Sequence, residues 1–129
     1  MSHSKVEIWI HAVIGVKYRR LQIKENIENE VYGKIFDKLV ENGCYVEAIN
    51  GVENHIHLLF RIKPTKSISE VIKNVKGSVS HHINKNKLTK SKFSWQVDYS
   101  AFSVSEANVK RVKLYISNQK EHHKSRPKN

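Results

Sequence analysis

Residues 53–60 read Glu53-Asn54-His55-Ile56-His57-Leu58-Leu59-Phe60, and this pattern predicts a β-strand at the centre of the fold. Successive side chains of a strand point to opposite faces of its sheet. One face of this strand is wholly apolar and can lie on a core; it carries Ile56, Leu58, Phe60 and Ile62. The opposite face is mixed; it carries His55, His57, Leu59 and Arg61. The stretch therefore predicts a sheet with one covered face and a second face that presents two histidines.

The imidazoles of His55 and His57 lie about 6–7 Å apart along the strand, judged from its rise per residue. Histidine is the commonest metal ligand in proteins, so the pair is a suitable start for a divalent-metal site. A bare His-x-His pair is also ordinary on the exposed face of a half-buried strand. Both interpretations stay open until the rest of the chain is considered.

Length and composition indicate one domain, residues 1–129, with a single core and a loose basic tail at 124–129. No apolar run approaches the roughly 20 residues of a membrane span, and the N-terminus shows no signal-peptide pattern, so we expect a cytoplasmic protein with no membrane partner. The single cysteine, Cys44, excludes an intramolecular disulfide and a multi-cysteine zinc site. We expect Cys44 to be a small core residue.

The net charge of +11 at pH 7 belongs mainly to two segments in the second half of the sequence. Residues 1–60 carry seven Lys and Arg against eight acidic residues, whereas residues 61–93 carry nine against Glu70 alone. Residues 105–129 carry seven against two. Clustered positive charge is typical of a protein that binds a polyanion, and nucleic acid is the first candidate. A basic surface that serves only solubility is the alternative.

Hydrophobic periodicity predicts the other elements. We expect strands at residues 6–16 and 44–52, a strand or extended loop at 93–99, and helices over 24–42, from 67 onward and from 105 onward. Ser67 and Glu70 form a capping box at the second helix. Either Asn50-Gly51 or residues 51–54 supply the turn before the histidine strand. This order predicts an α+β protein with a ferredoxin-like antiparallel sheet and helices packed on one face.

Two basic groups are candidate DNA contacts. Lys17, Arg19 and Arg20 follow the first strand around Tyr18, which suits phosphate contact and base stacking, although a solvated loop explains them equally well. Lys73, Lys76 and Ser80 share one face of the second helix, which suits a phosphate backbone. His11 lies on the mixed face of the first strand, where we favour a structural role. The pairs His81-His82 and His122-His123 are assigned to DNA contact or to solvent.

On the last helix Tyr115, Gln119 and His123 follow one another at intervals of four residues and so share a face. With the histidine strand, the Lys17-Tyr18-Arg19-Arg20 turn, Lys76-Gly77-Ser78, and Trp95 before Asp98-Tyr99, this helix resembles the single-tyrosine HUH transposases of small bacterial and archaeal insertion sequences. The matching features span nearly the whole chain. The fold expected from this resemblance is of the HUH endonuclease type.

The resemblance implies that His55, His57 and Gln119 bind Mg²⁺ or Mn²⁺, and that Tyr115 attacks a phosphodiester of single-stranded DNA. A 5′-phosphotyrosine and a free 3′-hydroxyl would form, and the reaction would later be reversed to join new ends without a nucleotide cofactor. The resemblance further implies a homodimer, with Tyr115 acting in its own or the partner's site, and recognition of imperfect DNA hairpins at the element's ends. His123 is an alternative to Gln119 as a ligand.

The chemistry of these residues agrees with the resemblance. Mg²⁺ prefers oxygen ligands and Mn²⁺ accepts imidazole more readily, so a histidine-rich site favours Mn²⁺ in affinity. A tyrosine, with a free pKa near 10, needs activation to act as a nucleophile. The family often has an acidic residue before the first histidine, whereas this chain has Asn54, so the support of His55 is in question. Three alternatives remain: a replication-type HUH nicking nuclease, a non-catalytic module that binds single-stranded DNA or RNA, and a metal-dependent hydrolase that uses water.

Overall fold

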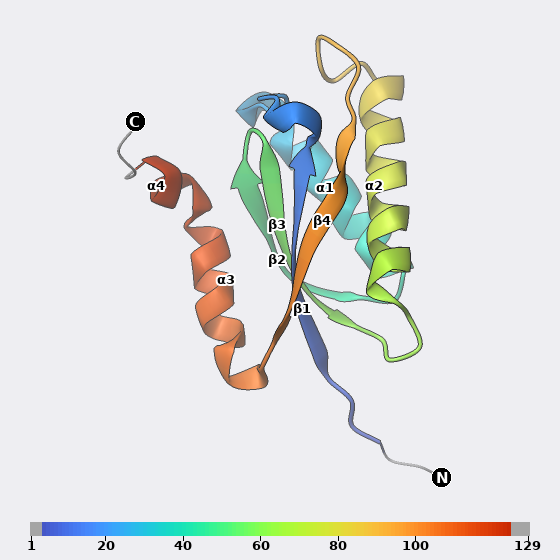
Figure 1. Cartoon of the computed structure of the whole chain (residues 1–129), viewed down its shortest axis with the longest axis vertical. Helices are drawn as coiled ribbons and strands as arrows, with labels where there is room; N and C mark the ends of the chain where they lie inside the picture. Colours follow the sequence, from blue (N-terminus) through green and yellow to red (C-terminus); the bar gives the residue numbers. More distant parts are fainter. Residues whose placement is uncertain (1–3, 125–129) are drawn as a thin grey trace.

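The computed structural model describes residues 4–124, and it shows one four-stranded sheet with helices on both faces (Figure 1). The predicted loose tail lies outside the described residues, apart from Lys124. In chain order the elements are β1 (Ile8–Val16), η1 (Lys17–Arg19), α1 (Glu25–Glu41), β2 (Tyr45–Val52), β3 (His55–Ile62), α2 (Ile68–Lys85), β4 (Trp95–Val104), η2 (Glu106–Asn108), α3 (Val109–Ser117) and α4 (Gln119–Lys124).

The strands lie in the order β2-β3-β1-β4, and every neighbouring pair is antiparallel. The predicted ferredoxin-like α+β class is therefore confirmed. The histidine strand β3 is central, and its register with β1 sets His57 opposite Val13 and His55 opposite Gly15. A central strand is held by hydrogen bonds on both sides, which gives the two histidines a rigid support.

The main core lies between the sheet and the pair α1 and α2. Alternate residues of β3 enter it, and Ile56, Leu58 and Phe60 are fully buried. The helices contribute the stripes expected from their periodicity: Ile27, Val31, Ile35 and Leu39 from α1, and Val71, Ile72, Val75, Val79 and Ile83 from α2. Each such side chain stabilises the fold by about 1.5–3 kcal/mol relative to exposure. Cys44 is buried in this core as predicted.

The prediction of helices on one face holds for α1 and α2, whereas α3 lies over the opposite face. A second, smaller cluster joins them there, in which Trp9 and Leu59 of the sheet meet Val109 and Ile116 of α3. The reason is visible in the sequence, since Leu59 is an apolar residue on the face that carries the histidines. The mixed face of β3 is therefore partly covered, and the cover is the helix that bears Tyr115.

Several local features can be compared with the expectation. The hairpin turn is Glu53-Asn54, which lies within the second of the two predicted alternatives, because strand pairing continues through Val52 and His55. The last helix is interrupted at Asn118, which separates α3 from α4. At the second helix, the backbone N–H of Glu70 donates to Ser67 Oγ at 3.1 Å, as predicted for the cap.

None of the helices in the part of the chain that is described is long and apolar enough to cross a membrane.

Candidate active site

His55 and His57 lie side by side on β3, with ring centroids 5.2 Å apart. The pleat of the strand turns both toward α3 while it directs Ile56 into the main core. His57 is only 6% exposed, so water reaches little of its ring. A pair of imidazoles this close on a rigid strand is suited to share one cation.

Each of these rings has a polar neighbour at Nδ1. The Oδ1 atom of Asn54 lies 2.7 Å from Nδ1 of His55, so the asparagine supports the first histidine although the resembling family often has an acid there. The Nε2 atom of His11 lies 2.9 Å from Nδ1 of His57, and the two rings stack with centroids 5.1 Å apart. Partners of this kind fix the tautomer and the orientation of a ligand histidine. A metal would then be bound through Nε2 of each ring.

Burial lowers the pKa of His11, which favours its neutral form. A neutral imidazole has one acceptor nitrogen, and that nitrogen can receive the Nδ1–H proton of His57. The sequence placed His11 on the correct surface and favoured a structural role. The structure shows what this role is: His11 contacts the ring of His57 and supports it.

Tyr115 on α3 stands over this face of the sheet. Its ring centroid lies 5.7 Å from that of His57, with the planes nearly perpendicular, and 6.3 Å from that of His11. The side chain is 43% exposed, so a substrate can reach it from solvent. The burial of Val109 and Ile116 against Trp9 and Leu59 holds the helix in this position.

Gln119 is the first residue of α4, and its side chain is completely buried. Its Nε2 donates to the carbonyl oxygen of Tyr115 at 3.4 Å, whereas its Oε1 has no hydrogen-bond partner. A buried polar atom without a partner costs about 1–3 kcal/mol and usually marks strain, catalysis or a bound ion. The amide oxygen is a hard donor of the kind that Mg²⁺ and Mn²⁺ accept.

The donor set fits a divalent ion. Over the described side chains, no three His, Cys, Asp or Glu residues form a group that could hold a metal, so within this part of the chain a third protein ligand would be of another type. The unpartnered Oε1 of Gln119 supplies such a donor next to Tyr115. The alternative ligand, His123, has its side chain outside the described residues.

Two residues that the sequence did not single out anchor this region. Asn50 of β2 donates from Nδ2 to the carbonyl oxygens of Ile116 at 2.9 Å and Ser117 at 3.2 Å. Lys120 donates from Nζ to Asn50 Oδ1 at 2.8 Å and to the Gly51 carbonyl at 3.1 Å. The junction of α3 and α4 is thereby fixed beside His57, whose partner on β2 is Asn50. In the sequence, Asn50 stood out only as part of Asn50-Gly51, one of the two candidates for the hairpin turn, and Lys120 gave no signal.

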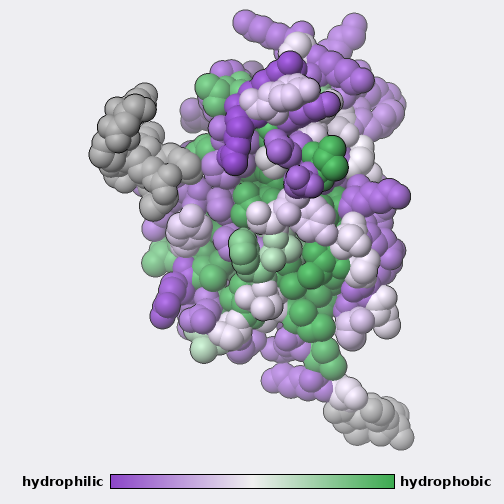
Figure 2. Space-filling model, in the orientation of Figure 1, coloured by the Kyte–Doolittle hydropathy of each residue, from purple (hydrophilic) through white to green (hydrophobic). Residues whose placement is uncertain are grey.

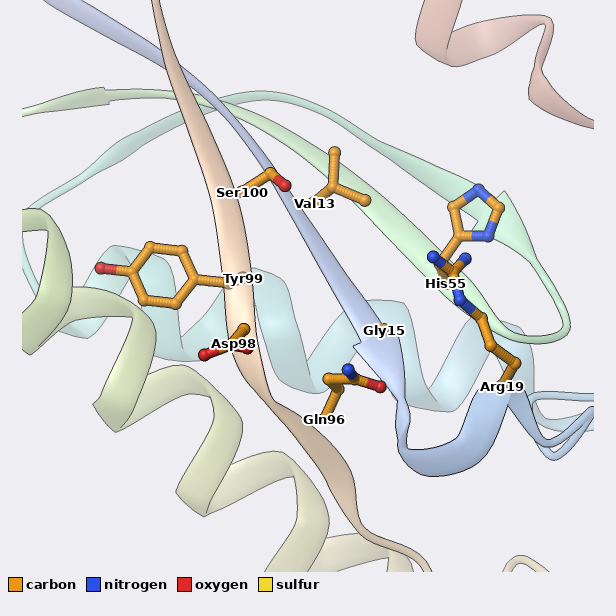
Figure 3. Close-up of a pocket in the computed structure, with 8 residues that line it drawn as sticks. All are labelled: Val13, Gly15, Arg19, His55, Gln96, Asp98, Tyr99 and Ser100. Carbon is orange, nitrogen blue, oxygen red and sulfur yellow. The ribbon is translucent and has the colours of Figure 1, made fainter.

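The structure separates the two groups of candidate DNA contacts. Arg19 is the last residue of η1, which follows β1, and it lines a cavity of about 230 Å³ together with His55 (Figure 3). Lys17 and Arg20 flank it in and after η1, and both are exposed. Hydrophilic side chains crowd this end of the molecule, where η1 and the loop before β4 meet (Figure 2).

The α2 group lies on the other side of the sheet, away from the histidines (Figure 1). Lys76 donates to the carbonyl oxygens of Gln96 and Val97, and burial lowers its pKa. Ser80 Oγ donates to the Gly77 carbonyl, and Lys73 is exposed. The structure therefore brings Arg19 to the histidine pair and leaves Lys73, Lys76 and Ser80 apart from it.

The two histidine pairs set aside by sequence also differ. His82 donates to a carboxylate oxygen of Glu30 at 2.7 Å and so links α2 to α1, whereas His81 is exposed. The side chains of His122 and His123 fall outside the described residues.

A ferredoxin-like sheet with a histidine pair on a central strand, and a tyrosine on the helix α3 above it, defines a domain of the HUH type. Residues 4–119 match the family model described as "Transposase IS200 like". The chain belongs to the IS200-like transposase family.

Individual proteins are similar to the chain in sequence or in fold. The chain is 26% identical over 115 residues to the ISDra2 transposase TnpA of Deinococcus radiodurans, covering 84% of this chain and 81% of that protein. A crystal structure of an inferred transposase from Deinococcus radiodurans matches with a TM-score of 0.73 at 21% identity, covering 92% of this chain and 98% of the other. A tyrosine transposase associated with REP sequences, solved with a REP hairpin bound, matches with a TM-score of 0.71 at 13% identity, covering 95% and 74%.

Proposed function

We propose that this transposase, a member of an enzyme class that cleaves DNA and transfers strands, acts on single-stranded DNA at hairpin-flanked ends of its element, with Tyr115 as the nucleophile. The phenolic oxygen attacks phosphorus, the bond from phosphorus to the 3′-oxygen breaks, and the 3′-oxygen leaves with a proton as a hydroxyl. The DNA stays attached as a 5′-phosphotyrosine until another 3′-hydroxyl attacks it. The covalent bond conserves the energy of the phosphodiester, so no nucleotide cofactor is required.

One observation carries this proposal, namely the contact of Tyr115 with His57. The ring of this half-exposed phenol lies 5.7 Å from that of His57, while Val109 and Ile116 hold α3 on the sheet. The geometry suits a group that meets a phosphate bound in front of the histidines. Arg19 supplies positive charge on the near side of the same face.

We further propose that His55, His57 and Gln119 hold Mg²⁺ or Mn²⁺. When bound, the ion would polarise the phosphate and stabilise negative charge on the leaving oxygen. The chain's own contribution is orientation: Asn54 and His11 fix the two rings, and the Nε2 contact with the Tyr115 carbonyl restrains the amide of Gln119 and leaves its Oε1 without a protein partner. Two imidazole donors favour Mn²⁺ over Mg²⁺ in affinity.

The proposed partners are DNA hairpins and a second copy of the chain. The REP-associated relative is bound to a hairpin, and the exposed basic residues Lys17, Arg19 and Arg20 in and after η1 would give this chain a surface for a similar ligand. For the dimer, β4 is an edge strand whose Val97 and Phe102 are well exposed. Such an edge is able to pair with another strand. Tyr115 meets the histidines of its own chain here, so one protomer can contain the whole constellation.

A denaturing gel tests the nucleophile. Labelled single-stranded hairpin DNA from the element's ends is incubated with protein and Mn²⁺, and a slow-migrating protein–DNA adduct is expected. The adduct should vanish with Tyr115→Phe and with EDTA, and should persist with the matched control Tyr45→Phe, an exposed tyrosine. DNA binding without any adduct would instead support a non-catalytic binding module. Cleavage that survives Tyr115→Phe would support a hydrolase that uses water.

The metal is tested without DNA. Mn²⁺ titrated into the apo-protein is expected to raise its melting temperature, because a ligand that binds only the folded state stabilises it. His57→Ala should abolish the rise and Gln119→Ala should reduce it, whereas Gln22→Ala on the exposed loop before α1 should leave it unchanged. An undiminished rise in His57→Ala would overturn the assignment.

A further inference from the structure

The cavity beside His55 owes its shape to an irregularity in β4. Ile14 pairs with Tyr99 and Val16 pairs with Trp95, so the three residues Gln96–Asp98 stand opposite Gly15 alone. The extra residues bend the strand outward, as a bulge does. Gly15 of β1 forms the floor of the cavity, where the absence of a side chain leaves the space open. His55 of β3 lines the side of the cavity that lies across β1 from β4 (Figure 3).

Lys76 stabilises this bent segment. Its ammonium group donates to the carbonyl oxygens of Gln96 and Val97, which the bulge has released from regular pairing with β1. Burial lowers the pKa of Lys76, while the charge of Asp98 acts in the opposite direction. The lysine that the sequence assigned to a phosphate backbone therefore shapes the wall of a cavity instead.

Arg19 reaches the cavity from a strained turn. Tyr18 and Arg19 have φ angles of 59° and 54°, in the left-handed region that non-glycine residues rarely adopt. Such residues cost of order 1 kcal/mol each and cluster at functional sites. The turn is held by the Lys17 N–H, which donates to the Ser94 carbonyl at 3.0 Å. This turn conformation brings Arg19 to the cavity, which it lines together with His55 (Figure 3).

The cavity thus has two chemically different ends. Arg19 and His55 form a cationic and metal-binding end, whereas Gln96, Asp98 and Ser100 on β4 form an end of hydrogen-bonding groups. We propose that the cavity binds one unstacked nucleotide next to the scissile phosphate. The phosphate of this nucleotide would lie at Arg19, and its base would lie against Gln96 and Asp98. This rests on the proposed function only in placing the scissile phosphate at His55. The volume of about 230 Å³ is below the 300–1,000 Å³ of pockets for larger ligands and suits a single base.

The chemistry of Asp98 selects guanine. An ionised carboxylate only accepts hydrogen bonds, through two oxygens side by side. Guanine alone presents two adjacent donors, N1–H and the N2 amino group, whereas the other three bases place an acceptor next to a single donor. That acceptor would face the carboxylate, which adds repulsion to the loss of a hydrogen bond. The amide of Gln96 can donate to the guanine O6.

Mononucleotide binding tests the pocket independently of catalysis. Uniformly ¹⁵N-labelled full-length protein is titrated with dGMP, dAMP, dCMP and dTMP, and the backbone amide shifts are followed. We expect dGMP to bind at least about tenfold more tightly than the others, within the range for one bidentate base contact. Its shifts should centre on Gly15, Arg19 and Gln96–Ser100. Equal affinities for all four, or shifts centred elsewhere, would overturn the proposal.

Variants connect the preference to Asp98. Asp98→Asn should bring dGMP to the level of the other three nucleotides, because the amide offers one acceptor and one donor in place of two acceptors. Asp37→Asn is the matched control: the same chemical change on an exposed position of α1 should leave the preference intact. A preference that survives Asp98→Asn would refute the assignment of the base contact.

The two proposals fail separately. Tyr115→Phe should lose the DNA adduct and keep the dGMP preference. A wild-type protein that prefers dGMP but forms no adduct would refute the tyrosine chemistry and leave the pocket standing. An adduct that forms without any preference among the mononucleotides would refute the pocket alone.

Discussion

Replacing Asn50 with alanine is expected to loosen the helix that carries Tyr115 while the sheet stays folded. The substitution removes two N–H donations to carbonyl oxygens of Ile116 and Ser117 and one acceptor of the Lys120 ammonium. Neutral hydrogen bonds contribute about 1 kcal/mol each and charge-assisted ones about 1.5–3 kcal/mol. Asn50 is half-buried, so water replaces part of the lost hydrogen bonding. We expect a net loss of about 2 kcal/mol in the free energy of docking for α3 and α4.

Native-state hydrogen exchange measures this loss, because local opening exposes the amides of α3 without global unfolding. A change of about 2 kcal/mol corresponds to roughly 30-fold faster exchange. Amides of β1 and β3 should be unaffected. The control is Lys113→Ala, which removes only a surface ion pair between α3 and Glu47 of β2 and should change exchange less than about threefold. Equal effects of the two substitutions would refute the view that Asn50 anchors the helix.

Three further predictions concern buried groups. Ile116→Ala should lower the free energy of unfolding in urea by about 2–4 kcal/mol, because it empties the centre of the smaller core, whereas Leu114→Ala on the exposed side should cost little. Burial raises the pKa of the Cys44 thiol, so Ellman's reagent at pH 8 should react slowly with native protein and rapidly in urea; fast native reaction would contradict this. Burial lowers the pKa of His11 from 6.5, so as the pH falls the unfolded chain takes up a proton before the folded protein does. The stability present above pH 6.5 should therefore be lost as the pH falls below it. In urea titrations the free energy of unfolding should fall less with decreasing pH in His11→Gln than in the wild type.

The sequence predicted what local periodicity encodes. Alternation on β3 separated the histidines from the core residues, and Ser67 marked the start of α2, because both signals depend on neighbours along the chain. The long-range contacts had no such signal. Nothing local places His11 against His57, 46 residues away, or Lys120 against Asn50. These contacts follow from strand register and helix docking, which only the assembled sheet defines.

The same limit applies to β4. Phe93, Trp95, Val97 and Tyr99 alternate along the chain and predicted a strand or an extended loop, yet their burial does not follow one face, since Val97 is 87% exposed. Phe93 and Trp95 pack edge to face in the main core, and the strand then bends away from β1. The extra residues of a bulge change which face of the sheet the neighbouring side chains point to, so a pattern that is regular in the sequence becomes irregular in space.

The position of Tyr115 and Gln119 on the last helices has a genetic consequence. A premature stop codon just after Val104 would delete both residues, while all four strands, α1, α2 and the main core would still be translated. We expect such a product to keep the basic end and the histidine pair but to leave Trp9 and Leu59 uncovered. Under the proposed function, such a product would occupy DNA ends without cutting them. A single nonsense mutation would therefore turn the gene into the source of an inhibitor that competes with the full-length protein for the same ends.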